Sequence, residues 1–249
     1  RSEKMSKSKK NVVAPDVIIG GYGADTARWF VLSDSPPERD MEWTAAGVEG
    51  AWRFAQRLWR LNATWIEAHP ALKSAQSQPG SLTDAATALR RASHKAIAGV
   101  SEDIEKFRFN RAVAKLYEFA NTLSDLPEKD LGDAAGLFAR REALLTLAQL
   151  IGPMMPHLSE EMWAALGHGT LLAETAWPEA DPRLIIDDTA TVAIQVNGKL
   201  RATIQLPRDC QKDQAEAAAL AEDAVIRALE GKAPKKIIVV PNRIVNVVV

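Results

Sequence analysis

The amino-acid sequence predicts a mostly α protein: an N-terminal segment, an antiparallel helical bundle and a small C-terminal α+β domain. Three observations support this fold class. Between residues 44 and 167, apolar residues recur with the 3.6-residue period of amphipathic helices, and the connections are short. From residue 190 the apolar period changes to two, which is typical of strands. All seven tryptophans lie before residue 180, so the remainder differs in composition and indicates a separate domain.

Short helices are expected in the N-terminal segment, residues 1–43. Pro15 favours a helix start, and this first helix should end in the glycine-rich sequence IIGGYGAD. The next helix begins near Asp25 and is closed by the Ser-Pro-Pro sequence at 35–37. An extended stretch (DMEW) then leads into the bundle.

The bundle, residues 44–167, is expected to contain five helices. They begin at or near Thr44, Thr83, Asn110, Asp133 and Pro156. Asn110 and Asp133 are of the residue types that cap helix N-termini, and proline is favoured in a first helical turn. A polar stretch with Pro and Gly (PALKSAQSQPGSL) forms the loop between the first and second helices.

Residues 168–189 are expected to be a loop-like linker, and residues 190–249 a domain with the order β-β-α-β-β. Asn197-Gly198 between two alternating segments is a strong signal for a hairpin. On the return strand, the apolar residues at 200, 202, 204 and 206 are expected to share the core face. An alanine-rich helix over residues 211–230 and two Val/Ile-rich strands complete the domain.

Composition describes an ordinary globular chain of 249 residues with 47% hydrophobic and 25% charged residues. The net charge of -1 gives no global sign of a nucleic-acid partner, although clusters of Lys and Arg can exist within a balanced total. The single cysteine, Cys210, excludes a disulfide framework and a cysteine-based zinc site. We therefore expect no metal site, a reducing cytoplasm as the compartment and, without a signal peptide or a membrane-length apolar run, no membrane partner.

The first ten residues carry four lysines and one arginine against one glutamate. Such a run is often only a solvated terminus. However, the sequence KMSKS, residues 4–8, also presents ammonium and hydroxyl groups on a loop of small residues. Ammonium groups on a mobile loop can stabilise the negative charge of a departing pyrophosphate. The five residues by themselves leave both interpretations open.

KMSKS resembles the signature loop of the class I aminoacyl-tRNA synthetases. The resemblance implies that Lys4 and Lys7 are catalytic, because they stabilise the triphosphate of ATP, bound with Mg²⁺, and Lys7 is the stronger candidate. It also implies an ATP-binding loop made of Lys4, Met5, Ser6, Lys7 and Ser8. Lys10 stands where many members have glycine before asparagine, a departure that bears on loop flexibility and lies outside the five core residues.

The rest of the chain is similar, in order, to the leucyl type of these enzymes. VVAPDVIIGGYGADTARWFVL resembles their helical stem-contact segment. SPPERDMEWTAAGVEGAWRF is similar to the leucyl version of the entry to the bundle, and FNRAVAKLYEF and PHLSEEMW resemble its bundle of the tRNA anticodon-binding type. VAIQVNGKLRATIQLP and PKKIIVVPNRIVNVVV resemble its small tRNA-binding C-terminal domain. The resemblance implies ATP-dependent attachment of leucine to tRNA(Leu).

Other parts of such an enzyme are not found in this sequence. None of the four histidines belongs to a HIGH-like motif, and no glycine-rich turn of the phosphate-binding type is present. We therefore expect the chain to be the C-terminal part of a leucyl enzyme of this family, a cytoplasmic monomer that is inactive alone and binds no ATP by itself. The expected partners are tRNA(Leu), and ATP and leucine through upstream domains.

Two alternatives remain. The chain could be a free-standing, non-catalytic tRNA-binding module, although it does not begin with methionine. It could also be the equivalent part of a valyl or isoleucyl enzyme. The isoleucyl type often ends in a cysteine-bound zinc module, which one cysteine does not allow, and the valyl type typically ends in a long coiled coil, for which the helix at 211–230 is too short.

Basic and aromatic side chains are candidates for tRNA contact. One set shares a face of the first bundle helix and could touch the tRNA backbone or form a solvated face: Arg53, Arg57 and Arg60. A second set could form a basic face on the C-terminal domain: Lys199, Arg201, Lys235, Lys236 and Arg243. Three tryptophans could stack on bases, but bundle core or its edge is our expectation for Trp52, Trp59 and Trp65.

Overall fold

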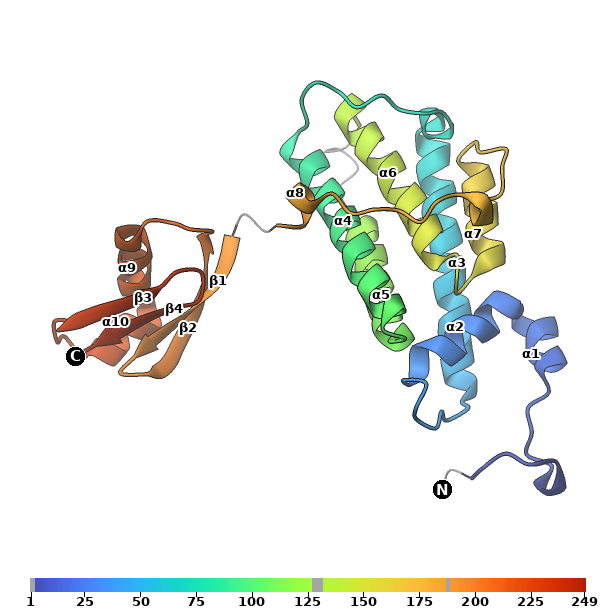
Figure 1. The fold of residues 1–249 in the computed structure, drawn as a ribbon, viewed down its shortest axis with the longest axis horizontal. Helices are drawn as coiled ribbons and strands as arrows, with labels where there is room; N and C mark the ends of the chain where they lie inside the picture. Colours follow the sequence, from blue (N-terminus) through green and yellow to red (C-terminus); the bar gives the residue numbers. More distant parts are fainter. Residues whose placement is uncertain (1–2, 127–131, 187–188) are drawn as a thin grey trace. The chain divides into compact units, whose positions relative to one another are not determined.

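The structure, a computed structural model, describes residues 3–126, 132–186 and 189–249. The chain divides into two compact units, Arg1–Ile185 and Ile186–Val249. Figure 1 shows that the first is built of helices and that the second combines a sheet with short helices. The expected mostly α fold class, with a bundle and a small α+β domain, is confirmed.

Short helices follow the N-terminal loop. A 3-10 turn, η1, spans Lys7–Lys9, and the helices α1 and α2 span Pro15–Tyr22 and Ala24–Asp34. Pro15 lies in the first turn of α1, where its missing N–H has no intrahelical partner to lose. Gly23, with a φ of 85°, separates α1 from α2. Glycine is favoured at such a left-handed φ, so the glycine-rich sequence marks the boundary as expected.

The helices of the bundle within the described residues are α3 (Ala45–Ala68), α4 (Asp84–Glu105), α5 (Phe109–Ser124), α6 (Ala134–Ile151) and α7 (Pro156–Ala165). Thr44, Thr83 and Asp133 cap three of them. Each side chain accepts a hydrogen bond from the backbone N–H three residues later, at 3.1, 3.2 and 2.7 Å respectively. These bonds satisfy donors that a helix leaves unpaired at its start.

The prediction that Asn110 caps α5 is wrong. The chain leaves α4 through a Schellman turn, in which the N–H groups of Phe107 and Arg108 bond back to carbonyls of the last turn, at 2.9 and 2.7 Å. Phe107 adopts a left-handed φ of 55° there. Because this turn reverses the chain within two residues, α5 already begins at Phe109, and Asn110 lies inside its first turn.

The N-terminal helices are anchored on the bundle by aromatic residues. Trp29 of α2 is fully buried; its ring stacks on Phe54 of α3, with centroids 5.0 Å apart. The indole Nε1 of Trp29 donates a hydrogen bond to the hydroxyl of Tyr117 on α5 at 3.1 Å. A buried indole needs such an acceptor for its N–H. One tryptophan therefore joins α2 to two bundle helices.

Helix α6 is buried on nearly every side, as expected for a helix surrounded by others. It nevertheless carries the buried cations Arg140 and Arg141. The guanidinium of Arg141 donates to the backbone carbonyl of Leu72, and to that of Leu166 at 2.8 Å. The guanidinium of Arg140 lies over the ring of Trp65, 5.0 Å from its centroid. Burial lowers the pKa of Arg141, and its bonds fasten the segment after α3 and the end of α7 to α6.

The sequence suggested a linker over residues 168–189, of which 187–188 lie outside the described residues; residues 168–185 pack on the first unit. They include the short helices η4 (Leu172–Glu174) and α8 (Pro182–Ile185). The indole Nε1 of Trp177 donates to the hydroxyl of Ser101 on α4 at 2.8 Å. The carboxylate of Glu160 on α7 accepts backbone N–H groups at the start of η4, at 2.7 and 2.9 Å. Polar contacts of this kind are not visible in a sequence that reads as loop.

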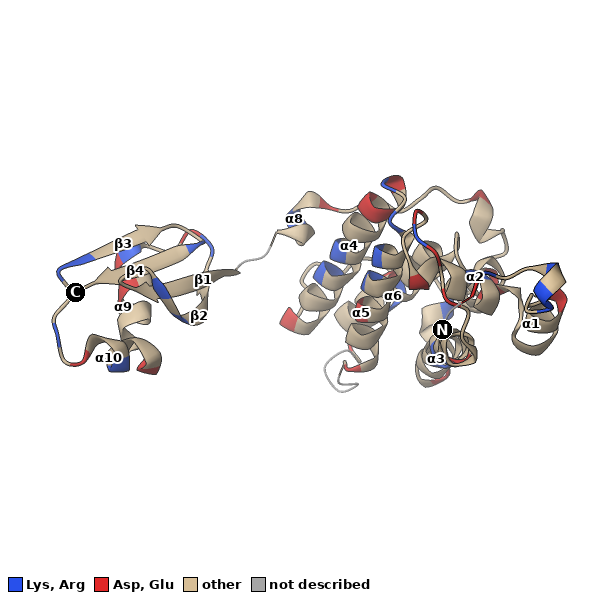
Figure 2. Ribbon diagram, turned by 90° about the horizontal axis from the view of Figure 1, so that it is seen from below, with Lys and Arg blue, Asp and Glu red and all other residues tan. Residues whose placement is uncertain are grey.

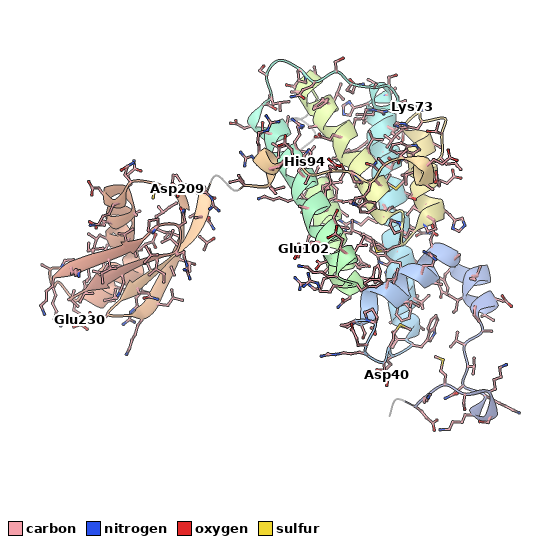
Figure 3. The ribbon with its side chains drawn as sticks, in the orientation of Figure 1. Asp40, Lys73, His94, Glu102, Asp209 and Glu230 are labelled. Carbon is pink, nitrogen blue, oxygen red and sulfur yellow. The ribbon has the colours of Figure 1, made fainter. Side chains whose placement is uncertain are left out.

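A histidine also holds this segment on α4. His94, labelled in Figure 3, accepts the backbone N–H of Asp181 on Nδ1 at 2.9 Å. In the neutral ring Nε2 therefore carries the proton and donates to Glu142 of α6 at 3.3 Å. Arg90 donates to the same carboxylate at 2.7 and 3.0 Å. Burial raises the pKa of Glu142, but the bonds from His94 and Arg90 outweigh burial and hold it below its usual range.

The second unit places helices on one face of a mixed sheet (Figure 1). Its elements are β1 (Thr189–Val196), β2 (Lys199–Pro207), α9 (Lys212–Ala221), α10 (Asp223–Leu229), β3 (Lys236–Val240) and β4 (Ile244–Val248). The strand order is β2-β1-β4-β3; β1 and β4 are parallel and the outer pairs antiparallel. Buried Val, Ile, Leu and Ala side chains of the central strands and both helices form a core of their own.

Two local predictions for this unit are wrong. The register of β1 and β2 shifts between Ile194 and Gln195, which leaves Arg201 unpaired as a bulge. Because of this one-residue shift, the β2 side chains that precede the bulge face the opposite side of the sheet, and Leu200 is exposed rather than in the core. The helix expected over 211–230 is divided, because Glu222 has an extended backbone between α9 and α10.

Among the residues that the structure describes, no helix is both long enough and apolar enough to cross a membrane.

Candidate functional site

The KMSKS loop is a short, exposed polar structure. Ser6 precedes η1 as its cap, and its hydroxyl accepts the backbone N–H of Lys9 at 3.3 Å. The hydroxyls of Ser6 and Ser8 lie 3.2 Å apart. Met5 is exposed as well, and the loop contributes no buried residue. The shape of the loop therefore depends on hydrogen bonds and not on packing.

Lys4 and Lys7 are exposed on this loop and differ from their neighbour Lys9. Lys9 forms an ion pair with Glu3. Within the described part of the chain, no carboxylate lies within ion-pairing distance of Lys4 or Lys7. Their ammonium groups are thus available for an external anion, and the serine hydroxyls beside them can donate further hydrogen bonds. Such a set fits a polyphosphate, for which lysine is a common partner.

Sequence reasoning missed Asn11, which closes the loop. Its side-chain Oδ1 accepts the backbone N–H of Ser6 at 2.7 Å, and its Nδ2 donates to the carbonyl of Lys4 at 3.3 Å. Lys10, immediately before it, has a left-handed φ of 53°. Asparagine next to a turn residue is the pattern that could have indicated such a side-chain bond to backbone.

The arginines expected on α3 have different surroundings. Arg53 lies 3.6 Å from Glu49 in an exposed i,i+4 pair. Arg57 donates to the hydroxyl of Ser124 at 3.1 Å, which ties α3 to the end of α5. Arg60 is exposed and borders a groove along α3. They share one side of α3, but the structure engages Arg57 between helices, so a role in tRNA contact stays a prediction for this set.

Aromatic rings line the groove beside Arg60. Trp52 and Trp59 are 38% and 42% exposed, so they lie at the edge of the bundle and not in its core, which is one of the two positions expected for them. The groove has a volume of about 670 Å³ and is bordered on its other side by Tyr22 and Leu158. Trp65 is half-buried beneath the guanidinium described above. Exposed indoles next to an arginine are able to stack on bases, so the exposure of Trp52 and Trp59 keeps base stacking open as a prediction for them.

The cations expected on the second unit lie at two places on the sheet. Lys199 and Arg201 begin β2, and Lys235 and Lys236 begin β3; β2 and β3 are the two edge strands. The register places both beginnings at the end of the sheet where β1 and β4 finish, so the pairs are about 14 Å apart across three strand spacings. Arg243 precedes β4 and lies at the opposite end. All five are exposed.

A second basic cluster, on α4 and α5, was not expected from the sequence. Asp103 is fully buried, and it pairs with Lys115, with Arg108 Nε at 3.1 Å and with Arg111 Nε at 3.5 Å. Figure 2 shows both basic and acidic residues on the helices of the first unit. The three cations are 31–56% exposed, so one buried carboxylate holds them at the surface. Among the described residues, no group of three or more His, Cys, Asp and Glu side chains is arranged to hold a metal ion.

Comparison with known proteins supplies the family. A family model described as the anticodon-binding domain of tRNA ligase matches residues 87–216. A model described as tRNA synthetases class I (I, L, M and V) matches residues 1–44, which include the KMSKS loop. Because the first match covers more than half of the chain, the chain belongs to the tRNA ligases that carry this anticodon-binding domain.

Two individual relatives and one solved structure are all enzymes for leucine. The leucine–tRNA ligase of Paramagnetospirillum magneticum is 59% identical over 249 residues, which is all of this chain and 28% of the relative. That of Rhodospirillum rubrum is 55% identical with the same coverage. A crystal structure of the agnB2 LeuRS of Agrobacterium radiobacter K84, in a ternary complex with tRNA and LeuAMS, gives a TM-score of 0.82 at 29% identity over 98% of this chain and 31% of that chain.

The chain thus spans about 28% of the length of the curated relatives and matches their C-terminal part. The resemblance to leucyl-tRNA synthetases that the sequence suggested is confirmed.

Proposed function

We propose that the chain is the C-terminal part of a leucine–tRNA ligase and contributes an ATP loop and tRNA-binding surfaces to it. The observation that supports this function most strongly is 59% identity to such a ligase along the whole chain, including the exposed KMSKS loop. The whole enzyme uses ATP to join leucine to tRNA(Leu). The chain alone does not catalyse this reaction, because its sequence contains no HIGH-like motif and the residues that the structure describes form no nucleotide-binding fold.

In the first step, a carboxylate oxygen of leucine attacks the α-phosphorus of ATP. The bond from that phosphorus to the bridging oxygen of the β-phosphate breaks, and pyrophosphate leaves with the oxygen and its electron pair. Leucyl-adenylate remains. The ammonium groups of Lys4 and Lys7 stabilise the negative charge that develops on pyrophosphate, and the hydroxyls of Ser6 and Ser8 donate hydrogen bonds to its oxygens. Mg²⁺ enters as the complex with ATP.

In the second step, a hydroxyl of the terminal ribose of tRNA(Leu) attacks the leucyl carbonyl carbon, and AMP leaves as the hydroxyl proton is lost. The bundle and the second unit bind the tRNA during this step. Lysines at the ends of the edge strands β2 and β3, and arginines on α3, contact phosphates of its backbone. Such contacts position the tRNA without reading its sequence. We further propose that the enzyme acts as a monomer in the cytoplasm.

Capture of total tRNA by the full-length protein, followed by sequencing, tests this function. Leucine tRNAs should be enriched at low salt, and their retention should fall steeply as salt rises, because lysine–phosphate contacts release counterions. Enrichment of valine or isoleucine tRNAs would contradict the leucine assignment. Retention of no tRNA at low salt would contradict tRNA binding, and light scattering on the same preparation checks the monomer.

A further inference from the structure

One side chain closes the loop that carries Lys4 and Lys7. Asn11 accepts the backbone N–H of Ser6 on Oδ1, at 2.7 Å, and donates from Nδ2 to the carbonyl oxygen of Lys4, at 3.3 Å. The two backbone groups flank Met5 and face the same amide. The hydrogen bonds therefore join residue 11 to the loop at two points that are seven and five residues away.

The carboxamide of Asn11 satisfies both partners. The N–H of Ser6 needs an acceptor and the carbonyl of Lys4 needs a donor, and an asparagine side chain has one of each. A carboxylate would serve the first and repel the second. An alanine would serve neither, and both backbone groups would turn to water. The left-handed φ of Lys10, 53°, brings the chain round so that the Asn11 side chain returns toward residues 4–6.

These bonds act on the groups that the proposed function uses. The bonded carbonyl belongs to Lys4 itself. The bonded amide belongs to Ser6, whose own hydroxyl caps η1, and Lys7 is the first residue of that turn. The side-chain amide of Asn11 therefore fixes, relative to each other, the backbone positions from which the side chains of Lys4 and Lys7 extend. No residue of η1 is buried, so no core packing replaces this restraint.

We propose that Asn11 is a positioning residue for the formation of leucyl-adenylate. It touches neither ATP nor leucine; it holds the backbone from which Lys4 and Lys7 reach the departing pyrophosphate. This role rests on the proposed function. It is distinct from a general contribution to folding, because the bonds of Asn11 lie within the loop.

The test is leucine-dependent ATP–pyrophosphate exchange by the full-length ligase with Asn11→Ala. Loss of alignment by about 1 Å lowers a rate by roughly 10²-fold, so kcat should fall by about that factor. The KM for leucine should stay within about twofold, because the loop does not form the amino-acid pocket. Lys10→Gly is the matched control: it changes the adjacent residue, fits a left-handed φ and keeps both bonds, and its kcat should remain at the wild-type value.

Two further measurements separate positioning from other roles. In an enzyme that carries both Lys4→Ala and Lys7→Ala, adding Asn11→Ala should lower kcat by less than about threefold, because a residue that acts through the two lysines loses its effect without them. Hydrogen exchange of loop peptides should be faster in Asn11→Ala and unchanged in helices of the bundle. A wild-type kcat in Asn11→Ala, a full additional loss of about 10²-fold when Asn11→Ala is added to the enzyme without both lysines, or unchanged loop exchange would overturn the proposal. Unaltered exchange of pyrophosphate by Lys7→Ala would instead contradict the proposed function.

Discussion

Replacing Asp103 with asparagine should destabilise the first unit by about 2 kcal/mol. The carboxylate is fully buried and pairs with Lys115, Arg108 and Arg111. Removing one partner of a buried ion pair costs about 3–5 kcal/mol when the other is left buried. Here the cations are 31–56% exposed and can be rehydrated, and an asparagine oxygen still accepts one hydrogen bond, so the cost falls to about 2 kcal/mol.

Urea unfolding of the 249-residue chain, followed by tryptophan fluorescence, measures this change. All seven tryptophans belong to the first unit, so the signal does not report on the second. Followed by heating instead of urea, the same substitution should lower the thermal unfolding midpoint of the first unit by roughly 4–8 °C, since 1 kcal/mol corresponds to about 2–4 °C at this size. The neighbouring exposed Glu102, labelled in Figure 3, pairs with Lys106 and Arg108 at the surface, and Glu102→Gln is the control, whose cost should be well below that of Asp103→Asn. An Asp103→Asn chain as stable as wild type, or equal costs for both substitutions, would refute the reasoning.

Three further outcomes are expected. Phe107→Gly should stabilise the first unit by about 1 kcal/mol in the same urea assay, because Phe107 holds a left-handed φ with its ring exposed and glycine favours that position; a loss of stability would show that the ring contributes more than the strain costs. The lowered pKa of Glu142 contributes stability that is present above the ordinary glutamate pKa of about 4.3 and is lost as the pH falls through the lowered value; Glu142→Gln should flatten this part of the pH–stability curve, and an unchanged curve would contradict the assignment. Lys199→Ala and Lys236→Ala should each lower the slope of log affinity for tRNA against log salt by about one, measured by filter binding, whereas Arg243→Ala at the other end of the sheet should leave the slope unchanged; equal effects for all three would mean that the whole sheet surface binds tRNA.

Local sequence features predicted much of the fold because the interactions behind them are local. Thr44 and Asp133 cap helices through N–H groups only three residues away. Pro15 favours a helix start through the fixed φ of its own ring. The Asn197-Gly198 hairpin likewise depends on two residues that tolerate a positive φ.

Features that depend on distant partners were not predictable in this way. The Schellman turn at Phe107 has no glycine to mark it, so the start of α5 was misplaced at Asn110. Residues 168–185 read as loop because the groups that hold them, including Ser101 and His94, lie on α4, far away in sequence. The bulge at Arg201 arises from pairing with β1, which the strand's own alternation does not reveal.

The candidate site shows the same division. The chemistry of Lys4 and Lys7 was inferred from the KMSKS sequence together with the resemblance of the residues that follow it, and the structure places both lysines on one exposed loop. Asn11 was missed because its role depends on the backbone of the loop and not on its own type. Trp52 and Trp59 were expected in the bundle core or at its edge, and the sequence could not distinguish these two positions, although a tryptophan in an amphipathic helix is more often buried than not.

Aminoacylation of total tRNA by the full-length protein that contains this chain tests the central claim most directly. The assay supplies labelled leucine, isoleucine, valine or methionine, each with ATP, and compares the wild type with Lys7→Ala. We predict charging with leucine alone and a loss of at least about 10²-fold in the variant. Charging with isoleucine or valine instead, or full leucine charging without Lys7, would contradict the assignment of this chain to a leucine–tRNA ligase with a catalytic KMSKS loop.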